Sequence, residues 1–258
     1  MPGVTIRLCI STMDDELLEQ RSFTCDLPLG NCIPVGTARC DLSRFKEPVQ
    51  LLVSAQVENT DIRNQWHIWV YPAEKKAIDK LPYITTRLDK TAQDKLNNGE
   101  SVLLLTYGAV PPEKGGDIAV GFSSIFWNTA WTRGQAPHTL GVCCDAKHPA
   151  LAAFPNEGVS DYQWWDLMSR CDAMILDDYP EGFRPIVHIV DDWFTNRKLG
   201  MLYEARVGKG KLLVCSADLQ NDLASRPAAA QFRQSLLEYM MSGQFNPKQE
   251  VEIDKIRY

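Results

Sequence analysis

The sequence predicts a multidomain α+β protein, in which a partial antiparallel β-sandwich precedes an α/β layer domain. Short alternating apolar runs fill residues 1–73, and longer continuous apolar runs alternate with helical patterns in residues 76–258. A polar, charged segment after Pro72 separates the two patterns. Because strands buried on one face alternate between apolar and polar residues, whereas strands buried on both faces do not, the two regions predict different kinds of sheet.

The first region contains strand-like runs separated by turn-forming sequences such as PLGN at 28–31 and ENTDIRN at 58–64. These runs are VTIRLCI, RSFTCDL, TARCDL, VQLLVSAQV and QWHIWVY. An immunoglobulin-like sandwich needs about seven strands. The region therefore predicts only part of such a sandwich.

The last run lies in NQWHIWVYP, residues 64–72, and both of its faces carry apolar or aromatic side chains. Alternate residues of a strand point to opposite sides. One side carries Trp66, Ile68 and Val70. The other side carries His67, Trp69 and Tyr71. We expect the first side in the sandwich core and the second against the α/β domain or the linker that leads to it.

The second region alternates strand and helix signals. Strands are predicted in SVLLLTYG at 101–108, CDAMILDD at 171–178, RPIVHIVDD at 184–192 and GKLLVCSADL at 210–219. Helices are predicted in TAQDKLNNG, HPALAAF, DYQWWDLM and RPAAAQFRQSLLEYMMSG. The last helix places an apolar stripe on one face, formed by Ala229, Phe232, Leu236, Leu237 and Met240. LGMLYEARVGKGKLLVCS predicts a hairpin that turns at Gly208 and Gly210.

Composition argues against several classes of partner and cofactor. The net charge of -6 and the lack of a long basic run argue against a nucleic-acid partner. No apolar run reaches the roughly 18 residues that cross a bilayer, so no membrane partner is expected, and the N-terminal residues show no export signal. The eight cysteines form no CxxC pair, and neither GxGxxG nor GxxxxGK[ST] occurs. We therefore expect no metal and no cofactor.

Candidate catalytic groups are weak. The GxSxG motif is absent, and the candidate nucleophiles are Cys143 and Cys144, the latter four residues before His148, and the neighbouring Cys215 and Ser216. A cysteine in an apolar strand is usually a packing residue. Asp177, Asp178, Asp191 and Asp192 follow predicted strands, where α/β sheets bind ligands, but such residues also cap helices. No catalytic residue is assigned.

The tryptophans carry more information, because five of them fall within 67 residues: Trp127, Trp131, Trp164, Trp165 and Trp193. Their neighbours are polar, as in FWNTAWTRG, DYQWWDL and DDWFTNRKLG. An aromatic ring beside Asn, Asp and Arg suits a sugar, since the ring stacks on C–H groups while the polar groups bind hydroxyls. The same rings suit a domain interface or a core.

These stretches resemble a known family. NQWHIWVYP resembles the closing strand of the immunoglobulin-like accessory domains of bacterial glycoside hydrolases of family 2, which are β-galactosidase-like enzymes. VLLLTYG, FWNTAW, the sequence from LGVCCDAKHP to YQWWDL, the sequence from RPIVHIVDD to CSADL, and RPAAAQFRQSLLEYM resemble a C-terminal region of such enzymes.

The resemblance implies a flavodoxin-like or class I glutamine amidotransferase-like α/β domain over residues 76–258, after the partial immunoglobulin-like β-sandwich of residues 1–73. The family's catalytic barrel normally precedes this region, and the chain lacks the length and the eight βα units of such a barrel. Proteins of this family are often periplasmic or extracellular.

We therefore expect a non-catalytic accessory portion of a glycoside hydrolase family 2-like protein that acts in carbohydrate degradation by packing domains or shaping a sugar cleft. The residues expected at a ligand or interface are Trp127, Asn128, Trp131, Asp161, Trp164, Trp165, Asp192, Trp193, Asn196 and Arg197. Expected partners are the catalytic and other domains of the parent hydrolase, an oligosaccharide, or a second copy of the chain. The alternatives are a stand-alone carbohydrate-binding module, and a hydrolase or amidotransferase with an unrecognised Cys or Ser nucleophile.

Overall fold

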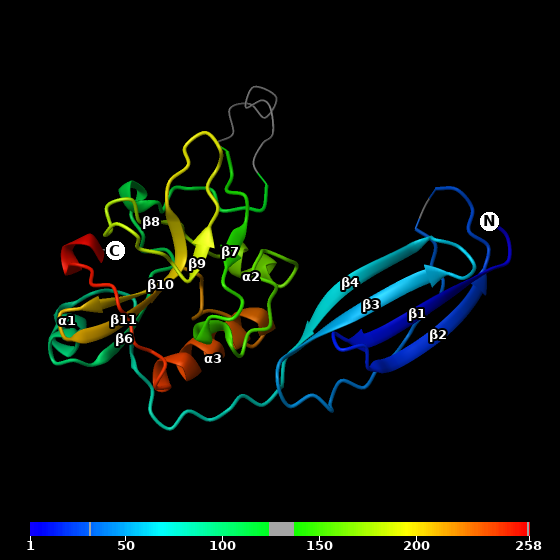
Figure 1. Cartoon of the computed structure of the whole chain (residues 1–258), viewed down its shortest axis with the longest axis horizontal. Helices are drawn as coiled ribbons and strands as arrows, with labels where there is room; N and C mark the ends of the chain where they lie inside the picture. Colours follow the sequence, from blue (N-terminus) through cyan, green and yellow to red (C-terminus); the bar gives the residue numbers. More distant parts are fainter. Residues whose placement is uncertain (31, 124–136, 257) are drawn as a thin grey trace. The chain divides into compact units, whose positions relative to one another are not determined.

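The computed structural model describes residues 1–30, 32–123, 137–256 and 258. It confirms the α+β class, with an antiparallel sheet, a mixed sheet and few helices. The chain divides into two compact units, Met1–Glu74 (unit 1) and Lys75–Tyr258 (unit 2), which are considered separately (Figure 1).

None of the helices in the described residues is long and apolar enough to cross a membrane.

Unit 1 is one four-stranded antiparallel sheet of order β2-β1-β3-β4 (Figure 1). Its strands are β1 Val4–Thr12, β2 Leu17–Cys25, β3 Val49–Val57 and β4 Arg63–Val70. The predicted strand TARCDL forms no strand in the structure. Gly36, just before this run, lies close to Phe23, since a Cβ atom on Gly36 would lie 2.1 Å from the Phe23 ring.

One face of this sheet is apolar but only partly covered. The register pairs Leu51 with Ile68 and Val53 with Trp66 on that face. Leu51 is fully buried, whereas Trp66 is 48% exposed. The expectation that Trp66 fills a sandwich core is therefore wrong for the described part of unit 1, which contains one sheet and no second sheet to cover this ring.

The remaining residues of the NQWHIWVYP strip, from His67 to Tyr71, are half-buried on both faces of the sheet. On the face opposite Trp66, the ring of Trp69 lies across from Gln50, which is buried. His67 and Trp69 also meet edge to face, with ring centroids 6.4 Å apart. The aromatic second face is thus partly covered rather than bare.

Unit 2 is built on a mixed sheet of order β5-β6-β11-β10-β9-β7, with β8 paired to β10. The strands are β5 Tyr83–Thr85, β6 Ser101–Leu105, β7 Val142–Cys144, β8 Met174–Ile175, β9 Val187–Ile189, β10 Leu199–Val207 and β11 Gly210–Cys215. β5, β6 and β11 are parallel, and the pairs from β11 to β7 are antiparallel. The predicted hairpin is confirmed, with its turn at Gly208 and Lys209.

β8 and β9 are much shorter than the apolar runs that predicted them. Both runs end in aspartates whose carboxylates accept backbone N–H groups of the next segment: Asp177 from Lys198 at 3.0 Å and Asp191 from Arg197 at 2.7 Å. Pro185, before β9, has no N–H group to donate to a sheet. These polar contacts replace ladder hydrogen bonds and shorten the strands.

Helices cover both faces of this sheet. The α-helices are α1 Lys90–Asn97, α2 Trp164–Ser169 and α3 Pro227–Met241, and the 3-10 turns are η1 Pro112–Lys114, η2 Pro149–Leu151 and η3 Ile253–Ile256. The side chain of Asp89 caps α1 by accepting the N–H of Ala92 at 2.9 Å. The predicted helix HPALAAF forms only the short turn η2.

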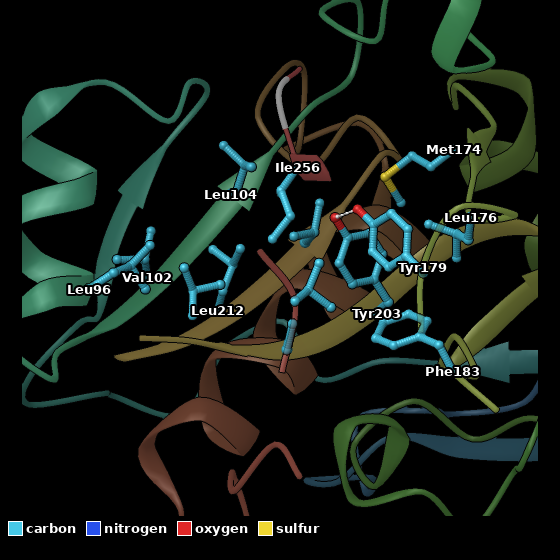
Figure 2. Close-up of a cluster of buried hydrophobic side chains, with 14 of the residues drawn as sticks. Leu96, Val102, Leu104, Met174, Leu176, Tyr179, Phe183, Tyr203, Leu212 and Ile256 are labelled. Carbon is cyan, nitrogen blue, oxygen red and sulfur yellow. Dashed lines mark hydrogen bonds between the residues drawn. The ribbon is translucent and has the colours of Figure 1, made fainter. Parts of the chain in front are cut away.

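On one face, an apolar cluster joins α1, β6, β10, β11 and the C-terminal segment (Figure 2). Leu96, Val102, Leu104 and Leu212 are fully or almost fully buried in it. The hydroxyl groups of Tyr179 and Tyr203 lie within the cluster and bond to each other at 2.9 Å, so their polar atoms are satisfied without water.

On the opposite face, α3 packs through its apolar stripe, all five residues of which are buried. The rings of Phe154, Trp164 and Phe232 meet edge to face, with centroids 5.0–5.9 Å apart. Such contacts are the preferred aromatic geometry. They fix α2 and α3 to each other, which matters for the site described below.

A buried ion pair joins the end of β11 to the start of α3. Nη1 of Arg226 lies 3.1 Å from Oδ2 of Asp218, and both side chains are almost fully buried. Nε of Arg226 also donates to Asp166 of α2 at 2.8 Å. One guanidinium therefore holds β11, α2 and α3 together.

We expect Phe232→Ala to lower the free energy of unfolding by about 3–5 kcal/mol, because it opens a cavity between Phe154 and Trp164. Denaturant unfolding would measure this change. Phe194→Ala is the matched control, since that ring is 67% exposed, and it should change stability by less than about 0.5 kcal/mol. Equal effects of the two variants would contradict the assignment of Phe232 to the core.

We expect Asp218→Asn to destabilise the protein by about 3 kcal/mol at pH 7, because it leaves the buried Arg226 charge without a full partner. Burial alone would raise the pKa of Asp218, but the N–H groups of Asn221 and Gln220 and the charge of Arg226 hold it below 3.8. This stabilisation is complete above pH 3.8 and is lost as the pH falls through the lower folded-state pKa.

Unfolding measured between pH 7 and pH 2 would test this expectation. The stability difference between wild type and Asp218→Asn should shrink below pH 3.8. Asp222→Asn is the control, because Asp222 makes an exposed ion pair with Arg170, and such pairs contribute at most about 1 kcal/mol. A difference that stays constant down to pH 2 would refute the role assigned to the Asp218 carboxylate.

Candidate functional site

The site residues expected from the sequence fall in three segments. Trp127, Asn128 and Trp131 lie outside the residues that the structure describes. Asp161, Trp164 and Trp165 lie on α2 or just before it. Asp192, Trp193, Asn196 and Arg197 lie on the loop between β9 and β10.

The neighbours Trp164 and Trp165 have opposite environments. Trp164 has no exposed surface, because its ring packs against Phe154 and Phe232. Trp165, on the other side of α2, is 61% exposed. Trp164 is therefore a core residue that anchors the helix, and only Trp165 offers its ring to a ligand.

Trp165 belongs to a small aromatic surface. Its ring stacks on Phe122 with a centroid distance of 5.5 Å and an interplanar angle of 4°. Its backbone N–H donates to the carbonyl of Tyr162, whose side chain is 83% exposed. We call Phe122, Tyr162 and Trp165 the aromatic platform. Asp161 supports it by accepting the N–H of Gln163 at 3.0 Å, which shapes the turn into α2.

The loop between β9 and β10 is fixed by its charged residues. Asp191, nearly fully buried, binds Arg197 through two side-chain hydrogen bonds of 2.9 and 3.0 Å. Oδ1 of Asp192 accepts the N–H groups of Phe194 and Thr195 at 2.8 and 3.0 Å. The carboxylate of Asp191 and one carboxylate oxygen of Asp192 are thus used within the loop, as is the guanidinium of Arg197.

This loop holds two aromatic rings in solvent. Trp193 is 50% exposed and Phe194 is 67% exposed, with ring centroids 6.1 Å apart. Asn196 has a positive φ of 56°, which asparagine tolerates better than most residues, and its N–H donates to the carbonyl of Asp192 at 3.1 Å. The predicted polar residues of this loop therefore position the aromatic side chains.

The sequence did not reveal a cleft of about 900 Å³ in unit 2, which is lined by many charged residues. Its walls come from β7, from the residues around η2 and β9, from β10 and from the segment after α3. The residues that line it are Cys143, Cys144, Asp145, His148, Asp177, Arg184, Pro185, Ile186, His188, Asn196, Arg197, Lys198, Glu204, Lys248 and Gln249.

The cleft occupies an interruption in the edge of β10. On this edge, β9 pairs with β10 as far as Leu202, and Arg206 pairs with the chain at Gln249 and Val251. Glu204 lies between these two stretches. Its neighbours Tyr203 and Ala205 point into the apolar cluster, so alternation directs Glu204 to the opposite face, where the hydroxyl of Tyr239 donates to its Oε2 at 2.5 Å.

His148 lies beside this carboxylate. Its ring meets Tyr239 edge to face, and its Nδ1 accepts the N–H of Ala150 at 3.2 Å. Burial lowers the pKa of His148, which the charges of Glu204 and Asp145 oppose. In the neutral ring, the hydrogen bond to Nδ1 places the proton on Nε2, which is then a donor.

The candidate nucleophiles are poorly suited to catalysis. Burial raises the pKa of Cys144 to about 12 and also raises that of Cys143. Cys215 and Ser216 have no exposed surface, and the hydroxyl of Ser216 donates to the carbonyl of Asp172 at 2.6 Å. A thiol is a nucleophile only as the thiolate, so burial favours packing roles for the thiols of Cys144 and Cys215.

All eight cysteines are free thiols. Within the described ranges, no group of three or more His, Cys, Asp or Glu side chains is arranged to hold a metal ion.

Family comparisons agree with the two units in extent and name no activity. Residues 1–72 match the family described as Domain of unknown function (DUF8488), and residues 83–258 match the family described as Domain of unknown function (DUF8487). No curated protein matches the chain. Since the match to residues 83–258 covers more than half of the sequence, the chain belongs to the DUF8487 family.

Proposed function

We propose that this chain is a non-catalytic accessory portion of a glycoside hydrolase family 2-like, β-galactosidase-like protein, and that its aromatic platform contacts carbohydrate during carbohydrate degradation. The observation that carries the proposal is the exposed, stacked position of the Trp165 ring. Its ring is 61% exposed and stacked on Phe122, while the adjacent Trp164 is locked in the core. A rigid exposed ring loses little entropy when it stacks on a sugar.

The resemblance of both regions to accessory domains of that family supports the same proposal. In unit 2, the parallel strands β5 and β6 are joined by α1, and β6 also pairs in parallel with β11, which fits a flavodoxin-like or amidotransferase-like domain. In unit 1, the partly covered apolar face with the exposed Trp66 fits one half of an immunoglobulin-like sandwich. The proposed partners are other domains of the parent hydrolase, an oligosaccharide or a second copy of the chain.

The alternative of a stand-alone carbohydrate-binding module uses the same platform and the exposed rings of Trp193 and Phe194. The two proposals differ in the affinity that they predict for the isolated chain and an oligosaccharide. A stand-alone module binds an oligosaccharide tightly by itself, whereas an accessory portion contributes only part of a sugar cleft. Calorimetry on the isolated chain separates the two.

We expect β-galactoside oligosaccharides to shift the indole NMR signal of Trp165, and Trp165→Ala to weaken their binding about tenfold by removing the stacking ring. Tyr162→Ala should have a smaller effect in the same direction. Trp66→Ala is the matched control, because Trp66 is a similarly exposed tryptophan in unit 1, and binding should not change. If no oligosaccharide moves the Trp165 signal, the carbohydrate role of the platform is rejected.

We expect iodoacetamide to label Cys144 much more slowly than Cys32 at pH 7, because a pKa of about 12 leaves almost no thiolate at Cys144. Cys32, which is exposed, is the internal control. Peptide mass spectrometry after timed labelling of the folded protein measures both rates. Faster labelling at Cys144, together with turnover of a glycoside or of glutamine, would instead support the nucleophilic-enzyme alternative.

A further inference from the structure

The cleft on β10 has a cationic side formed by Arg184 and Lys198. Burial lowers the pKa of His188, and the positive charges of Arg184 and Lys198 lower it further, against the opposing effect of Asp191. Both cations therefore lie within electrostatic reach of the His188 ring, which also lines the cleft. The ring stays neutral at pH 7 and can donate one hydrogen bond.

These cations lack the carboxylate partners that several other cations of unit 2 have. Arg197 is bound to Asp191, Arg226 to Asp218 and Arg206 to Glu250. Within the described residues, by contrast, no carboxylate forms an ion pair with Arg184, Lys198 or Lys248. In a chain with a net charge of -6, three such cations lining one cleft are available to an anionic ligand.

The opposite side of the cleft is acidic and accepts hydrogen bonds. Oε2 of Glu204 accepts the Tyr239 hydroxyl, which leaves Oε1 as an acceptor for a ligand hydroxyl. His148, on the same side, offers a ring donor. A ligand that carries an anionic group at one end and hydroxyl groups at the other matches these two sides.

Two further acids limit the charge of that ligand. Oδ1 of Asp177 accepts the N–H of Lys198, and Oδ1 of Asp145 accepts the N–H of Lys147. Both carboxylates shape turns at the wall of the cleft. Their negative charge disfavours a ligand with several acidic groups, such as a polyphosphate, and favours one with a single acidic group.

We propose that this cleft binds an acidic sugar unit, with its anionic group between Arg184 and Lys198 and its hydroxyl groups donating to Glu204. The volume of about 900 Å³ suits a mono- or disaccharide, since small-molecule sites span about 300–1,000 Å³. The inference rests on the proposed carbohydrate role but uses none of the platform residues. The anionic group is a uronate carboxylate or a sulfate ester, which share this chemistry.

The test is an NMR titration that follows the ring signals of His188 and His148, with three sugars that differ in charge: galacturonic acid, galactose 6-sulfate and galactose. We expect at least one acidic sugar to bind about tenfold more tightly than galactose, because a charge-assisted hydrogen bond contributes that much. The acidic sugar with the lower Kd identifies the anionic group. Added salt should weaken this preference.

Variants then locate the interaction. Arg184→Met and Lys198→Met should remove the preference for the acidic sugar, and Glu204→Gln should weaken the acidic and the neutral sugar alike. Lys209→Met is the matched control, because Lys209 is an exposed lysine in the β10–β11 turn, and the preference should be retained. Thermal denaturation of each variant verifies that it is folded.

Equal binding of all three sugars, no response of the His188 signals, or an unchanged preference in both Arg184→Met and Lys198→Met would overturn the inference. Trp165→Ala separates it from the proposed function. If the acidic-sugar response of His188 persists in that variant, and the Trp165 signal of the wild-type protein never responds to a neutral oligosaccharide, the cleft inference stands and the platform proposal fails. If the Trp165 signal responds to a neutral oligosaccharide but the His188 signals do not respond to an acidic sugar, the cleft inference fails and the platform proposal stands.

Discussion

The pairing of β10 is the constraint on which the rest of unit 2 depends. One edge of this strand pairs with β11 and β8, and the other pairs with β9 and then with the segment at Gln249. Its alternating side chains place Tyr203 in one core and direct Glu204 toward α3. Because β9 stops short of Glu204, an interval of the edge is left for the cleft, so the cleft exists as a result of strand length.

Buried ion pairs place the exposed aromatic side chains. Arg226, buried between Asp218 and Asp166, fixes α2 so that Trp165 faces solvent while Trp164 enters the core. Asp191 and Arg197 do the same for the loop that carries Trp193 and Phe194. Charges held at such cost are weak as stabilisers but specific in geometry. At α2 and in the β9–β10 loop, the ion-pair residues are close in sequence to exposed aromatic rings. Such an arrangement suits a surface that keeps its shape when it binds.

The strongly periodic strands and helices could be predicted from the sequence, whereas the surfaces formed by short segments and loops could not. β3, β6, β11 and α3 were predicted closely, because their apolar periodicity is strong and their ends carry glycine or proline. The predicted TARCDL strand is absent from the structure, although its residues alternate as a strand's do. The two adjacent tryptophans did not show which of them is buried, and only the structure places Trp164 in the core and Trp165 at the surface. The cleft was missed because Arg184, Lys198, Glu204 and Lys248 come from separate segments that only the register of β10 brings together.

The two candidate surfaces differ in the interactions that they offer to a ligand. The platform offers apolar ring faces, whose attraction to sugar C–H groups is insensitive to salt, whereas the cleft offers unpaired cations, whose attraction to an anion is weakened by salt. Cys144 and His148 border the cleft, yet burial keeps the thiol of Cys144 protonated and lowers the pKa of His148. A thiol that stays protonated serves as a packing group, and the neutral ring of His148 can form hydrogen bonds to a ligand.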